Sequence, residues 1–142
     1  MPTSDQHLAQ AAHNEGLLAL LRQQARHLEY GDWYVTVAFY TAIHHIEDML
    51  YVIKPKTRGS IIKHSSDVRK IFPYMSDHSA RGWLLKCGFH NLYDPYTDIY
   101  QLSQTAKYNC HSPSESDWSR TVSLLENIKA ECKIICETLP HN

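Results

Sequence analysis

One segment carries most of the information about the fold: Asp32-Trp-Tyr-Val-Thr-Val-Ala-Phe39-Tyr40-Thr-Ala-Ile-His44-His-Ile-Glu47-Asp-Met-Leu-Tyr-Val-Ile53. Its first half is apolar nearly all round, and a helix with that pattern is enclosed by neighbouring elements. Asp32 follows Gly31 and is a suitable N-cap, whereas Lys54-Pro55 is a stop signal. The segment therefore predicts a central helix from Asp32 to about Ile53.

Helical periodicity continues on both sides of this segment. Apolar residues at three- and four-residue steps predict a first helix roughly from Asp5 to Leu28. A short helix is expected around Ser66–Phe72, and a further helix is expected from a cap at Ser76-Asp77 to about Leu92. The sequence thus favours an all-α bundle with three or four long helices.

Two more helix starts are predicted from local signals near the C-terminus. Asp94-Pro95 predicts a helix start, because proline suits the first helical position. Ser112 and Glu115 have the spacing of a capping box, and Pro140 would close the helix that follows.

Composition restricts the class of protein. The chain has 142 residues with 43% hydrophobic and 20% charged residues, which suits a single domain over residues 1–142. No apolar run approaches the roughly 20 residues of a membrane span, and the N-terminus lacks a secretory signal pattern, so we expect a cytoplasmic protein. A net charge of −1 is far from that of a DNA-coating protein. The cysteines form no Cys-x-x-Cys pair and are interpreted as reduced packing residues.

The segment His44-His45-Ile46-Glu47-Asp48 allows two interpretations. His44 with Glu47, and His45 with Asp48, are spaced three residues apart on a helix. Carboxylate-bridged metal bundles use Glu-x-x-His on two helices, but here the order is reversed and there is no second copy. The alternative is a histidine held by a carboxylate inside the bundle, and we expect no bound metal.

A basic window follows the central helix. Its cations are accompanied by a single acid, Asp67, and they are Lys54, Lys56, Arg58, Lys63, Arg69 and Lys70. A guanidinium can grip a phosphate with two hydrogen bonds, and the nearby imidazole of His64 can transfer a proton near neutral pH. These are the two requirements of RNA cleavage without a metal. The alternative is a solvated basic loop in which Arg69 pairs with a carboxylate such as Glu47.

A later helical face combines phenols and a cation. Tyr100, Ser103 and Lys107 share one face, and Tyr108 follows them. Tyrosine with lysine can hold a phosphate or stack on a base, although an ordinary amphipathic helix edge has the same pattern.

Three separated segments together resemble small HEPN-domain proteins. They are the run Asp32–Glu47, the pair His64 and Arg69, and the segment Tyr100-Gln-Leu-Ser103-Gln-Thr-Ala-Lys107-Tyr108. The resemblance spans roughly residues 10 to 136. It implies an up-down bundle of four to five helices that forms a homodimer with a cleft near the two-fold axis.

The resemblance also implies a function. Many HEPN proteins are metal-independent ribonucleases, often toxins or defence effectors partnered with a nucleotidyltransferase antitoxin, and others are inactive dimers that bind nucleotides or act as scaffolds. Their motif is an arginine followed after four to six residues by a histidine. Arg58 and His64 have this spacing, whereas the late position of the motif carries Lys107 and His111.

From these features we expect a HEPN-like protein that binds RNA or a nucleotide, with no cofactor. His64 and Arg69 would supply proton transfer and a phosphate clamp, and His44 with Glu47 would orient them. The other residues expected to line the cleft are Arg58, Lys63, Tyr100, Ser103, Lys107 and Tyr108. Whether the site is catalytic stays open. The alternative is a non-catalytic scaffold or assembly subunit that mediates protein–protein interaction.

Overall fold

The computed structural model describes residues 2–53, 68–70, 72–108 and 113–139. The long regular elements in these ranges are α-helices, which confirms the all-α class. They are α1 (Ser4–Gln23), α2 (Gly31–Val52), α4 (Asp77–Gly88), α5 (His90–Tyr108) and α6 (Glu115–Thr138). None of these described helices is long and apolar enough to cross a bilayer.

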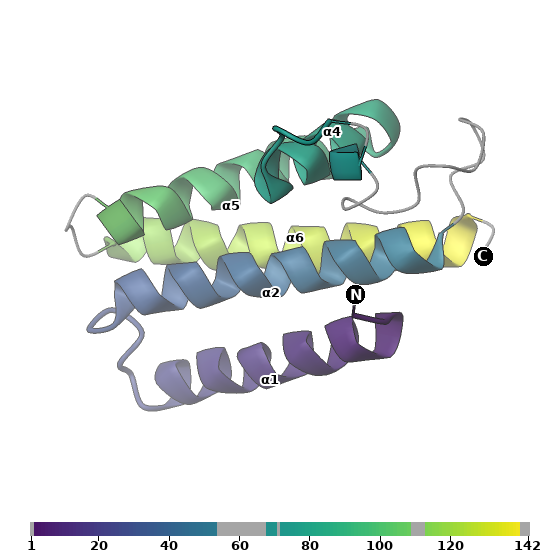
Figure 1. Cartoon of the computed structure of the whole chain (residues 1–142). Coiled ribbons are helices and arrows are strands. Elements are labelled where there is room, and N and C mark those ends of the chain that lie inside the picture. Colours follow the sequence, from purple (N-terminus) through teal and green to yellow (C-terminus); the bar gives the residue numbers. More distant parts are fainter. Residues whose placement is uncertain (1, 54–67, 71, 109–112, 140–142) are drawn as a thin grey trace.

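The four longer helices lie side by side and alternate in direction along the chain (Figure 1). Helix α2 contacts α1 on one side and both α5 and α6 on the other, whereas α4 packs on α5 (Figure 1). The expected central position of α2 is therefore confirmed. This arrangement brings α1, α2, α4 and α5 together around the middle of α2.

The core is built around one face of α2. Val35, Ala38, Ala42, Ile46 and Met49 are fully buried. They repeat at three- and four-residue steps, so that one stripe meets the buried faces of α5 and α6. Burial of a large apolar side chain such as Ile46 or Met49 contributes about 1.5–3 kcal/mol, so this stripe adds substantially to stability.

The first two helices differ from their expected limits. Helix α1 ends at Gln23 instead of Leu28, because the chain turns at Ala25, which has the left-handed φ of 54°. Asp32 is not the N-cap of α2. The helix begins at Gly31, and a Cβ atom there would lie only 3.2 Å from the Pro113 ring. A side chain at position 31 would therefore press on Pro113, and the helix starts here without a side-chain cap.

The boundary between α4 and α5 also differs from the prediction. Helix α4 ends at Gly88 and α5 begins at His90, so Asp94-Pro95 lies within a helix instead of starting one. Leu92, Tyr96 and Ile99 share one face of α5 and are fully buried. Burial of this continuous face outweighs the local proline signal.

The cap of α6 was expected at Ser112 with Glu115. Ser112 lies outside the described residues, and the structure forms the capping box two residues later. The Asp117 amide donates to Ser114 Oγ at 3.1 Å, and the Ser114 amide donates to Asp117 Oδ2 at 3.0 Å. The predicted type of cap is thus correct and its position is wrong.

Candidate functional site

A buried ion pair joins α2 to α4. Arg81 Nε donates to Glu47 Oε1 at 2.7 Å, and the side chains are 9% and 4% exposed. Arg81 Nη1 also donates to the hydroxyl of Tyr96 at 3.2 Å, which ties the pair to α5. We call Glu47, Arg81, Tyr96 and His78 the central cluster.

The position of Glu47 explains why the cluster forms. Glu47 lies beside the core stripe of α2 and is buried, and an unpaired carboxylate there is very costly. Burial disfavours the charged guanidinium of Arg81, but Glu47 and Tyr96 hold its pKa above the ordinary value. Burial likewise raises the pKa of Tyr96, so its hydroxyl stays protonated and can donate. Glu47 and Tyr96 therefore stabilise the charged form of Arg81.

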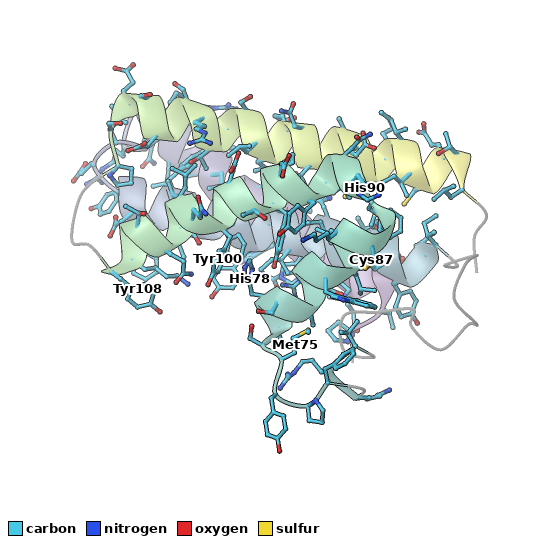
Figure 2. The ribbon with its side chains drawn as sticks, turned by 90° about the horizontal axis from the view of Figure 1, so that it is seen from above. Met75, His78, Cys87, His90, Tyr100 and Tyr108 are labelled. Atoms are coloured by element: carbon cyan, nitrogen blue, oxygen red, sulfur yellow. The ribbon has the colours of Figure 1, made fainter. Side chains whose placement is uncertain are left out.

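His78 is the histidine of the central cluster, and it is held on two sides. Its Nδ1 lies 2.7 Å from the Tyr96 hydroxyl. Its ring stacks on Tyr100 with centroids 3.4 Å apart and 13° between the planes. Figure 2 shows His78 and Tyr100 next to each other where α4 meets α5. The ring is thus fixed at Nδ1 and on one face, and His78 is partly exposed.

Electrostatics favour the neutral form of His78. Burial lowers its pKa, and the nearby Arg81 guanidinium lowers it further. A neutral imidazole held at one nitrogen by a hydroxyl is suited to accept a proton at the other. This combination of position and pKa is typical of a general base.

His44 lies on α2, one turn before Glu47. Its Nδ1 lies 3.0 Å from Nδ1 of His7 on α1, so the two rings share a hydrogen bond. Burial lowers the pKa of His44, and His7 and Arg81 lower it further. A shallow cavity of about 710 Å³ lies beside this pair, between α1 and α2. His44 is therefore a second neutral imidazole close to the central cluster.

The remaining charged residues of the His44–Asp48 segment also bond to other helices. His45 Nε2 donates to Glu15 Oε1 at 2.8 Å, and Asp48 accepts a hydrogen bond from Ser4. Burial disfavours the Glu15 carboxylate, but hydrogen bonds from His45 and Lys129 lower its pKa. No group of three potential metal-ligating residues occurs in the described ranges. The segment thus attaches α2 to its neighbours.

Three of the expected site residues, Arg58, Lys63 and His64, lie outside the described residues. Arg69 is exposed, and its Nη1 donates to Asp77 Oδ1 at 2.8 Å. The alternative partner considered for Arg69 was Glu47, whose carboxylate is instead bonded to Arg81. Arg69 is therefore attached to the residue adjoining His78, at the N-terminal end of α4.

The face expected on α5 is only partly exposed. Ser103 is fully buried and donates to the Tyr100 carbonyl at 2.7 Å. Lys107 reaches across to α2, where its Nζ lies 3.2 Å from the Tyr40 hydroxyl. Tyr108 is 73% exposed at the end of α5 (Figure 2). The structure thus brings Tyr100 to His78 and brings Lys107 to Tyr40.

Sequence reasoning missed Arg81, His78, Tyr96 and His7. A usable signal existed for Arg81, since an acid on an enclosed helix such as α2 requires a partner from another element. The sequence did not show which helix would supply it. His78 and His7 follow no motif, and only the packing of α4 and α1 brings them to the site.

The two neutral histidines predict a dependence of stability on pH. Their pKa values are lower in the folded chain than the unfolded value of about 6.5, so the unfolded chain binds more protons just below that pH. The free energy of unfolding should therefore fall as the pH falls from 7 towards 5. Urea denaturation followed by circular dichroism at several pH values measures this slope.

Two variants test whether this pH dependence comes from His44 and His78. His78→Gln removes one of the two groups and should flatten the slope. His13→Gln changes an exposed histidine of α1 and should leave the slope unchanged. Equal slopes in all three proteins would contradict the assignment.

Comparisons of the chain with protein-family models, with curated proteins and with solved structures found no match.

Proposed function

We propose that the protein binds RNA or a nucleotide through its phosphate and cleaves RNA without a metal ion, as the resemblance to HEPN proteins implies. The main support is His78, a neutral imidazole that Tyr96 and Tyr100 fix beside a buried guanidinium. Arg69, which bonds Asp77 next to His78, would contact the phosphate at the edge of the site. The proposal keeps the expected roles of Arg69 and His44 and adds His78 as the base.

The proposed chemistry needs two proton transfers. Neutral His78 would take the proton of a ribose 2′-hydroxyl, whose oxygen then attacks the adjacent phosphorus. The leaving 5′-oxygen needs a proton, which His64 is expected to supply. The guanidinium of Arg69 would stabilise the charge that builds on the phosphate oxygens in the transition state. His44, held by His7, would orient the site.

The experiment is RNA cleavage in EDTA by the whole chain. His78→Gln should reduce the cleavage rate by about 10²–10⁴-fold, the usual contribution of a general acid or base. The matched control is His90→Gln, which changes an exposed histidine at the first residue of α5. Equal rates for His78→Gln and the wild type would remove His78 from the mechanism.

Binding is measured separately from cleavage. Arg69→Ala should weaken RNA binding and reduce the slope of log K against log salt by about 1. Arg120→Ala is its matched control, because Arg120 is also an exposed arginine paired with one aspartate, Asp98. If neither variant differs from the wild type, Arg69 does not contact phosphate.

A second candidate function is a non-catalytic scaffold, and one observation favours it. The Glu47–Arg81 pair is almost completely buried and Tyr96 also bonds its cation, which is the arrangement of a purely structural ion pair as well. On this reading the wild-type chain would neither cut nor bind RNA, and variants of the central cluster would change only stability.

A further inference from the structure

Exposed aromatic side chains extend the candidate site along α2. Trp33 is 63% exposed and Tyr40 is 45% exposed. They are seven residues apart, so they lie on one face of the helix, and His44 follows one turn after Tyr40. Tyr108, at the end of α5, is 73% exposed. We call Trp33, Tyr40 and Tyr108 the aromatic row.

A cation lies within this row. Lys107 Nζ is 4.9 Å from the centre of the Tyr40 ring and 3.2 Å from its hydroxyl. Helix α5 leads from Tyr108 back to Tyr100, whose ring stacks on His78 of α4, and Figure 2 shows Tyr108, Tyr100 and His78 following one another along the side where α5 meets α4. Tyr108 of the aromatic row and His78 of the central cluster therefore lie along the same side of α5, with Tyr100 between them.

We propose that the aromatic row is a stacking subsite for the unpaired bases of a single-stranded RNA whose backbone continues to His78. This inference rests on the function proposed above. Proteins that bind single strands combine exposed aromatic side chains for the bases with cations for the backbone. A Watson–Crick duplex keeps its bases stacked on one another and hides their faces. The aromatic row thus selects single strands over duplexes.

The spacing of the row fits separate nucleotides. Seven residues of α-helix span about 10 Å, whereas stacked bases are about 3.4 Å apart. Trp33 and Tyr40 would therefore take different bases of one strand. Lys107 carries the charge complementary to the phosphates between them. This complementarity favours a nucleic acid over a second copy of the chain, which has a net charge of −1.

The experiment measures fluorescence anisotropy of labelled RNA with the full chain. The probes are a 2′-O-methyl oligouridylate of about 12 nucleotides, which cannot be cleaved, and a duplex of the same length. The wild type should bind the single strand more tightly than the duplex. Trp33→Ala and Tyr40→Ala should each weaken single-strand binding by roughly 5- to 150-fold without changing its salt slope. Lys107→Ala should reduce the salt slope by about 1.

The matched control is Tyr74→Ala, which removes a fully exposed aromatic residue outside the row and should leave binding unchanged. Equal effects of Tyr74→Ala and Trp33→Ala, or equal binding of the two probes, would overturn the stacking subsite while the proposed function stands. Absence of any RNA binding by the wild type would overturn both. A loss of self-association in Trp33→Ala, seen by light scattering without a change in RNA affinity, would assign the row to contacts between copies and overturn the inference.

Discussion

Arg81→Ala should lower the free energy of unfolding by about 3–5 kcal/mol, the largest effect expected from any single change in the site. The guanidinium is 8% exposed and bonds both Glu47 and Tyr96, so its removal leaves a buried carboxylate without its cation. Chemical denaturation followed by circular dichroism measures the loss. A decrease of less than about 1 kcal/mol would show that water reaches Glu47 and that the pair is not buried in solution.

A double variant of Arg81 and Glu47 distinguishes a role of the ion pair in stability from a role in RNA cleavage. Replacement of a buried ion pair by apolar residues of similar volume is often neutral or stabilising. Arg81→Met combined with Glu47→Leu should therefore recover most of the stability lost in Arg81→Ala. If the central cluster serves RNA, the recovered protein should still fail to cleave it. Full activity in the stable double variant would show that the pair is only structural.

Ile128→Ala should cost about 2–5 kcal/mol of unfolding free energy, because the side chain is fully buried in α6 and its loss leaves a cavity. Ile134→Ala on the same helix is the matched control. Ile134 is 51% exposed, so this change should stay within about 0.5 kcal/mol. Urea denaturation of the two variants in parallel checks the difference, and equal losses would place Ile128 outside the core.

Periodicity predicted the all-α class and the central position of α2, because a helix that is apolar nearly all round must be enclosed. It could not locate the ends of the helices. Helix α2 starts at Gly31, which packs closely on Pro113, and at Pro95 the burial of Leu92 and Tyr96 outweighs the local signal. These boundaries are decided by tertiary contacts that no short window of sequence contains.

The site residues on α2 could be predicted from the sequence, whereas those on α1 and α4 could not. His44 and Glu47 stood out because polar groups on an enclosed helix need partners. The identity of those partners depends on the rotation and position of α1 and α4. Helix α1 supplies His7, and α4 supplies Arg81, whereas Arg69 was the cation considered from the sequence. The HEPN resemblance and the homodimer that it implies stay predictions, and light scattering tests the dimer.

The attachment of α1 has a consequence for how the protein opens. This helix buries only His7, Ala11 and Leu18, and much of its contact with α2 is polar. Sub-global opening of such a helix requires less free energy than cooperative loss of the α2–α5–α6 core. A probe on α1 and a probe at a fully buried core position, such as Ile128, therefore report on different equilibria, and a single two-state midpoint describes only the latter.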